Sequence, residues 1–324
     1  MTTKPPQASY CRIVIRLVSL GIGLLFFSDT LWAQHSHVPE RIPALFDQLP
    51  VVYRDLERQL LIDAADGLLN HFSLIDAGLI ASGANTPYDL SQYRRRIKHI
   101  QQHATLSIPY LLQPEHQAAA LLAYLHRHVL RRFETRPVTA LDLWHSGKYN
   151  CITASWLYLI LARKYDLPVV VVETPMHAYI LLRTSPPVPI ELTLPSGGFN
   201  FTQTQNDVLN NLLLVGLIQP NDLQTIGAET LFATYLNRQR ELTPVQVLSV
   251  FFYNRALEQF EHLNTQTAFQ YALAAHIIHP EDERYHRLTR DFGRAFATSL
   301  RRETDVKSLQ AMTDFLQTFA PFHP

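Results

Sequence analysis

The sequence is poor in the residues that build several common kinds of functional site. Its 324 residues include 11 glycines and 2 cysteines. No glycine-rich phosphate-binding loop occurs, which argues against a nucleotide-dependent enzyme. A zinc site needs three or four converging ligands, and the sequence has neither a His-Glu-x-x-His motif nor a cysteine pair at ligand spacing. We therefore expect no metal and no cofactor.

Histidine is abundant, with 15 copies, but its spacing does not suit a metal site. His126 and His128 stand two residues apart, and residues two apart in a helix do not share a face. His35 and His37 would lie at the frayed start of the chain after removal of a targeting segment. Neither pair changes the expectation that the protein binds no metal.

An excess of either charge is also absent. The 28 basic residues equal the 28 acidic ones. Attraction to nucleic acid or to an anionic membrane depends on an excess of positive charge, so we expect no nucleic-acid partner. The hydrophobic fraction of 47% over 324 residues is enough for one large or two modest domains with a buried core.

Residues 1–33 are predicted to be a signal peptide. A basic start is followed by an apolar run at 17–27 and by a cleavage site that ends at Ala33. The apolar run is shorter than the roughly 20 residues of a membrane-spanning helix. We expect export to the periplasm, and the alternative is a membrane anchor formed by an uncleaved signal. Contact with a membrane is expected only in that alternative. The basic residues are Lys4, Arg12 and Arg16.

Export would leave Cys151 as the only cysteine, because Cys11 lies within the signal peptide. A disulfide within the mature chain is then excluded. A lone cysteine is either a small buried hydrophobic residue or a reactive thiol. The surroundings of Cys151 favour the reactive thiol, since Asn150 precedes it, an apolar helical run follows it, and a histidine and an acid lie downstream.

Cys151 is predicted to open a helix, which has a chemical consequence. At the start of a helix, unsatisfied N–H groups and the positive end of the dipole favour the thiolate, the nucleophilic form. The β-branched run 169–172 predicts a buried strand, and further strands are predicted at 179–182 and 190–193. His177 lies between the first two of these strands, and Glu191 lies in the third.

The order cysteine, histidine, acid is typical of thiol hydrolases. In such a site the imidazole exchanges a proton with the sulfur, and the carboxylate holds the other ring nitrogen. We therefore predict Cys151 as nucleophile, His177 as base and Glu191 as the residue that orients His177.

Five short stretches between residues 135 and 200 point to one family. They are Asn150-Cys151 followed by Ala154 and Ser155, the run from Leu161 to Pro168, the four valines at 169–172, Pro175-Met176-His177, and Ile190-Glu191-Leu192-Thr193. Together they resemble a bacterial transglutaminase-like core. The resemblance implies a papain-like fold that acts on the acyl groups of peptide amides, with the roles given above. The family commonly has Asp-Pro-Thr at the third position, where this chain has Glu-Leu-Thr.

The rest of the chain is predicted to be helical. Apolar residues recur at helix spacing between 34 and 134. A break occurs at Thr86-Pro87, after which Asp89 or Ser91 is the predicted cap of a helix. The arginines at 94–96 in that helix are most simply a solvated face, and the alternative is a role in binding an anion.

From residue 245 onward the spacing is that of one tetratricopeptide repeat. The residues concerned are Tyr253, Ala256, Phe260, Ala268, Ala272, Ala275 and Pro280. One repeat cannot bury its own apolar face, so it must pack on the rest of the molecule. It is either a helical hairpin that completes the fold or a groove for a protein partner.

The sequence thus predicts an exported α+β protein in four parts: the signal peptide, a helical leading region (34–134), a papain-like, transglutaminase-type core (135–205), and a helical, tetratricopeptide-like region (206–324). The predicted function is cysteine-dependent acyl transfer, of protease, amidase or transglutaminase type, on a peptide or protein substrate. Whether water or an amine accepts the acyl group stays open. The alternative is a catalytically inactive relative that binds a protein partner through its helical tail.

Overall fold

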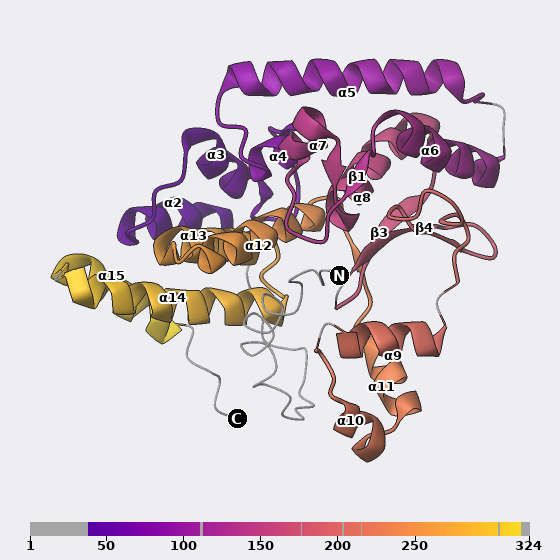
Figure 1. Cartoon of the computed structure of the whole chain (residues 1–324). Coiled ribbons are helices and arrows are strands. Elements are labelled where there is room, and N and C mark those ends of the chain that lie inside the picture. Colours follow the sequence, from indigo (N-terminus) through magenta and orange to yellow (C-terminus); the bar gives the residue numbers. More distant parts are fainter. Residues whose placement is uncertain are drawn as a thin grey trace, which may run out of the picture.

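The computed structural model describes residues 38–110, 113–175, 177–202, 204–214, 216–303 and 305–318. Within them helices dominate, and six short strands form two small sheets, an α+β arrangement (Figure 1). The predicted signal peptide lies outside these residues. Among the described helices, none combines the length and the apolar character that crossing a membrane requires.

The first helices form one side of the molecule, with α5 running along the top in Figure 1. The cap of α5 is Thr86, whose hydroxyl accepts a hydrogen bond from the Asp89 backbone N–H at 3.1 Å. The prediction of Asp89 or Ser91 as the cap was therefore wrong. Pro87 is better suited to the first helical position, where its missing N–H is not needed. These helices are α2 (Val38–Gln48), α3 (Asp55–Ala64), α4 (Leu74–Ala81), α5 (Pro87–Ser107) and α6 (Pro114–His128).

The four-stranded sheet has the order β5-β4-β3-β6 and is antiparallel throughout. The strands predicted at 169–172 and 179–182 are confirmed as β3 and β4. The third predicted strand was placed too far along the chain, because β5 ends at Ile190 and Glu191 follows it. β6 was not predicted, because two of its three residues are charged. The strands are β3 (Val169–Glu173), β4 (Ala178–Leu182), β5 (Val188–Ile190) and β6 (Arg240–Leu242).

Helix α8 (Cys151–Ala162) lies at the centre of the molecule. Every residue from Ile152 to Ala162 is buried, as expected of a helix that is apolar all round. It contacts β3 and β4 on one side and α4, α6 and α12 on others. It is preceded by β1 (Arg132–Phe133), α7 (Ala140–Ser146) and β2 (Lys148–Tyr149), and β1 pairs with β2 in the second, parallel sheet.

A glycine lets α4 lie directly against α8. A Cβ atom on Gly78 would stand 2.2 Å from the indole nitrogen of Trp156, which is fully buried. That nitrogen donates a hydrogen bond to the carbonyl of Leu74 at 3.2 Å. Any side chain at position 78 would therefore displace the indole and break its hydrogen bond.

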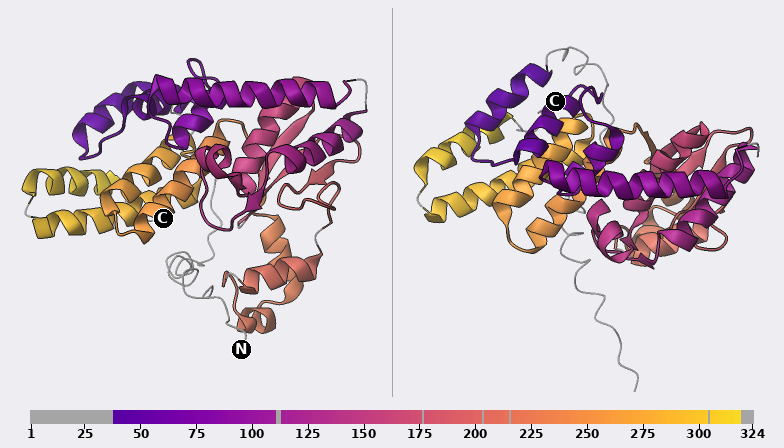
Figure 2. Two further views of the ribbon diagram at one scale, coloured as in Figure 1. Left: turned by 45° about the horizontal axis from the view of Figure 1, so that its top comes forward. Right: turned by 90° about the horizontal axis from the view of Figure 1, so that it is seen from above.

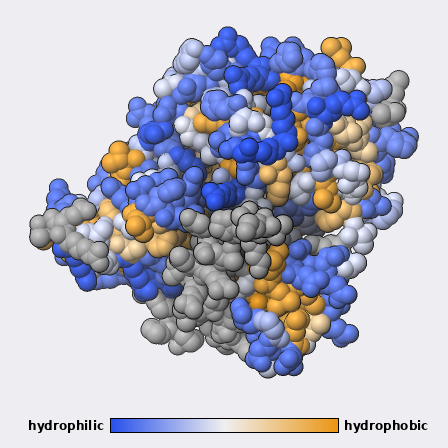
Figure 3. Space-filling view, viewed as in Figure 1, coloured by the Kyte–Doolittle hydropathy of each residue, from blue (hydrophilic) through white to orange (hydrophobic). Residues whose placement is uncertain are grey.

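Between β5 and β6 the chain forms a small helical lobe of α9 (Gln205–Leu214), α10 (Pro220–Thr225) and α11 (Ala228–Leu236). The lobe hangs below the sheet in Figure 1 and in the left view of Figure 2. It has its own apolar cluster, separate from the main core. Figure 3 shows further apolar side chains on its surface, and its exposed residues include Leu214, Ile226 and Leu236.

The helical tail packs on the rest of the molecule and shares its core. Helix α12 contacts α4 and α8, and α13 contacts α3. Every residue of α13 from Ala268 to Ile278 is buried. The main apolar core is continuous from Ile42 to Phe315. The tail helices are α12 (Gln246–Glu261), α13 (Thr265–Ile278), α14 (Glu283–Glu303) and α15 (Val306–Thr318).

A buried histidine in α13 should make the fold sensitive to acid. Burial, together with the nearby His286, lowers the pKa of His276 to about 4. An unfolded chain takes up this proton near pH 6.5. Stability should therefore fall as the pH drops from about 6.5 to 4, by on the order of 3 kcal/mol from this group. The measurement is urea unfolding at pH 7 and at pH 4.5.

The variant His276→Gln is the control, because acidic side chains also titrate in this range. The wild type should lose more stability between the two pH values than the variant does. An equal loss in both proteins would show that His276 does not cause the acid sensitivity.

Candidate active site

Cys151 is the first residue of α8, so the prediction that a helix begins there is confirmed. Asn150 caps the helix, and its side-chain oxygen accepts a hydrogen bond from the Thr153 N–H at 3.0 Å. The Thr153 hydroxyl accepts one from the Asn150 N–H at 2.9 Å. This reciprocal cap fixes the helix start, and Cys151 stays partly exposed with a free thiol.

His177 lies in the turn between β3 and β4. The Thr174 N–H donates to the His177 carbonyl at 2.7 Å, and the His177 N–H donates to the Thr174 hydroxyl at 3.0 Å. Both bonds fix the backbone from which the imidazole projects. The ring lies close enough to the side chain of Cys151 for the two to interact, and its Nε2 lies 2.5 Å from Oε2 of Glu191. Since Nε2 contacts Glu191, Nδ1 is the nitrogen left for the sulfur.

Glu191 is 5% exposed and is held by its own turn. Its Oε1 accepts hydrogen bonds from the Thr193 N–H at 2.7 Å and from the Thr193 hydroxyl at 2.6 Å. Oε2 is left for His177. The Glu191 N–H donates to the Gly198 carbonyl at 2.7 Å. A Cβ on Gly198 would lie 2.2 Å from the Glu191 carbonyl oxygen, so this turn requires glycine.

The charges of the three groups support one another. Burial opposes a charged ring at His177, yet its hydrogen bonds to Cys151 and Glu191 outweigh burial and raise the pKa of His177 to about 10. Burial also opposes the Glu191 carboxylate, but the hydrogen bond from His177 lowers the pKa of Glu191. At neutral pH the site therefore holds an imidazolium between a carboxylate and the cysteine sulfur.

Three further side chains lie close to this group and were not selected from the sequence as parts of the site. Tyr149 is buried, and burial followed by the charge of Glu191 raises its pKa. The rings of His126 and Tyr149 meet edge to face at 6.1 Å, and His126 lies near the backbone of Leu192. Of these side chains, only Tyr149 could have been selected from the sequence, because it directly precedes the Asn-Cys pair.

The third of these side chains, Tyr235, comes from α11 of the helical lobe. It is 4% exposed and lies next to the side chain of Thr174, the residue that fixes the backbone of His177. No local pattern in the sequence marks Tyr235, because its contact depends on how the lobe folds back on the sheet.

The described part of the chain holds no cluster of three or more histidine, cysteine, aspartate or glutamate side chains placed to bind a metal ion. Comparisons with protein-family models, with curated proteins and with solved structures find no match to this chain. The geometry and the charges of the site are therefore what indicates the protein's function.

Proposed function

We propose that the protein is a cysteine-dependent acyl-transfer enzyme, of protease, amidase or transglutaminase type, that acts on a peptide or protein substrate. The observation that carries the proposal is the position of His177, which lies next to Cys151 on one side and is hydrogen-bonded to Glu191 on the other. A charged imidazole between a sulfur and a buried carboxylate is suited to nucleophilic catalysis and needs no cofactor.

The proposed reaction has two steps. The Cys151 thiolate attacks the carbonyl carbon of an amide, and the N–H groups at the start of α8 stabilise the oxyanion. His177 gives its proton to the departing amine, which leaves a thioester on the sulfur. Water or a second amine then attacks the thioester, His177 accepts its proton, and the thiolate is restored. Glu191 orients the ring and stabilises its charged form throughout.

The proposal includes a papain-like, transglutaminase-type core and a tetratricopeptide-like tail. The core is supported by a cysteine at the start of a central helix that packs on an antiparallel sheet, with the histidine and the acid at the ends of neighbouring strands. The tail is supported by the antiparallel pair α12 and α13, with Ala256, Ala268 and Ala272 buried between helices. The proposal that the protein is exported depends on the sequence of residues 1–33 alone.

The rate at which iodoacetamide alkylates Cys151 tests the proposal. An ordinary thiol reacts slowly below about pH 8, because its pKa is about 8.5. We expect fast labelling to persist well below pH 8 in the wild type and to slow in His177→Ala. Alkylation is measured by mass spectrometry on the peptide that contains Cys151, so that labelling of Cys11 is not counted. Slow labelling in both proteins would reject the thiolate pair and favour a catalytically inactive protein.

Changing Glu191 to glutamine should lower kcat by about 10⁴-fold, because the neutral amide cannot stabilise the imidazolium or keep its orientation. Since Glu191 raises the pKa of His177, loss of the carboxylate should also move the basic limb of the pH–activity profile to lower pH. The shorter Glu191→Asp should lose about 100-fold through misplacement alone. A glutamine variant with unchanged kcat and pH profile would contradict the orienting role.

The alternative function, binding of a protein partner by the tail, has less support. In the described residues, the face of α13 that a groove would need is taken up by α3, α12 and α14. The tail therefore has the features of a helical hairpin that completes the fold.

A further inference from the structure

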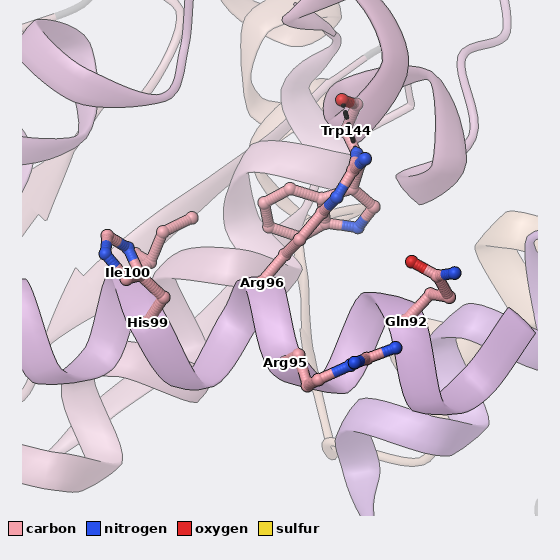
Figure 4. A pocket seen from close by; sticks show the side chains of 6 residues that line it. All are labelled: Gln92, Arg95, Arg96, His99, Ile100 and Trp144. Carbon is pink, nitrogen blue, oxygen red and sulfur yellow. Dashed lines mark hydrogen bonds between the residues drawn. The ribbon is translucent and has the colours of Figure 1, made fainter.

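Helices α5 and α7 enclose a hollow of about 420 Å³ on the surface of the molecule (Figure 4). Its α5 side consists of residues spaced three and four apart, which therefore share one face of the helix. Its α7 side consists of Trp144. The lining residues are Gln92, Arg95, Arg96, His99, Ile100 and Trp144. The sequence predicted a solvated face for this arginine run.

The hollow is strongly basic in a chain with no net charge. Helix α5 has three arginines and a lysine but only one acidic residue, Asp89. Arg94 forms an ion pair with Asp76. No such pair involves Arg95 or Arg96 among the described residues. Asp142 of α7 forms no ion pair with either arginine among the described residues, and its carboxylate accepts hydrogen bonds from the Thr139 N–H at 2.9 Å and the Thr139 hydroxyl at 2.8 Å.

The side chains of the hollow are partly arranged in advance. Arg96 donates a hydrogen bond to the Trp144 carbonyl at 2.9 Å, which holds its guanidinium beside the indole (Figure 4). Arg95 contacts only the carbonyl of Ser91 in its own helix, at 3.4 Å. Its guanidinium is therefore free to bind a ligand.

Trp144 forms the α7 wall of the hollow. Its indole nitrogen is buried below the surface and has no acceptor among the described residues, whereas the indole nitrogen of Trp156 is paired with the Leu74 carbonyl. The rest of the indole, together with Ile100, gives the hollow an apolar wall beside the arginines. The two arginines indicate a ligand that presents oxygen atoms with negative charge, and the apolar wall indicates that this ligand also has a carbon skeleton.

We propose that this hollow binds a small organic anion through a carboxylate or phosphate group. The guanidinium groups of Arg95 and Arg96 contact its oxygens, since the arginine fork matches both groups. Ile100 and the indole of Trp144 contact the apolar part of the ligand. The site is separate from Cys151, so it stands or fails independently of the proposed catalysis.

Nuclear magnetic resonance of the ¹⁵N-labelled full chain tests this directly, because tryptophan indole N–H groups give isolated signals. The probes are inorganic phosphate and citrate, titrated at constant ionic strength in chloride. We expect at least one of them to shift the Trp144 indole signal saturably, while the Trp156 signal stays in place. The variant Trp144→Phe assigns the signal. A response to only one probe identifies the preferred group.

Two matched variants distinguish specific binding in the hollow from non-specific electrostatic attraction of the anion to the helix. Arg95→Gln should weaken binding at least tenfold. Lys98→Gln removes the same charge from an exposed position on α5 outside the hollow, and it should leave binding unchanged. The proposal is overturned if neither anion shifts the wild-type signal saturably, or if both variants weaken binding equally.

Discussion

Replacing Cys151 with alanine should abolish turnover of every peptide amide that the wild-type protein processes, by about 10⁴-fold or more in kcat. The thiolate is the only group in the proposed mechanism that bonds to the substrate carbonyl, and neither His177 nor Glu191 can replace it. The measurement is the formation of amine product, followed by mass spectrometry for wild type and variant at equal concentration.

The fold should survive this change, since Cys151 is partly exposed and the cap of α8 comes from Asn150 and Thr153. Equal melting temperatures of the two proteins would establish that the variant loses catalysis and not the stability of its fold. Cys151→Ser should be nearly as inactive, because a hydroxyl is far less readily ionised than a thiol. Undiminished turnover in the alanine variant would reject Cys151 as the nucleophile.

Replacing Arg284 with methionine should destabilise the protein by about 3–5 kcal/mol, because it removes the ion-pair partner of the buried Glu173 and leaves the buried Asp282 with Arg240 alone among the described residues. Arg284 contacts Glu173 and Asp282, each at 2.5 Å, and Arg240 contacts Asp282 at 3.0 Å. Asp282 is fully buried and Glu173 is 7% exposed. Burial opposes a charged Asp282, yet its hydrogen bond from Arg284 lowers its pKa. Urea unfolding at pH 7 measures the loss.

Arg287→Met is the matched control for this prediction. Arg287 lies one turn further along α14 and pairs with the exposed Glu283, a contact whose loss should cost about 0.5 kcal/mol or less. A variant in which Glu173 and Asp282 are also made neutral should recover much of the stability lost with Arg284. Similar losses in the Arg284 and Arg287 variants would refute the importance of the buried network.

The elements that could be predicted from the sequence are those that depend on residues close together in the chain. Asn150 caps the helix that begins at the next residue, and four consecutive valines form a strand. The contact between His177 and Glu191 joins residues only 14 apart in the chain, across one pair of neighbouring strands. Strand pairing at that separation brings the two side chains together without help from the rest of the fold.

What could not be predicted depends on distant segments. Arg284 meets Glu173 across 111 residues of chain. β6 is a strand only because β3 offers it a free edge, since its own composition is that of a charged loop. Glu191 lies beyond its strand because Gly198 and Thr193 form a turn around it. No short-range periodicity encodes such contacts.

The helical lobe is joined to the sheet at both ends, since it follows β5 on one edge and leads into β6 on the other. Its apolar cluster is separate from the main core. Local unfolding of the lobe therefore costs less than global unfolding and leaves the helices behind the sheet intact. The contact between Tyr235 and Thr174 joins the lobe to the turn of His177. Through that contact, local unfolding of a peripheral segment would uncover the turn from which the imidazole projects.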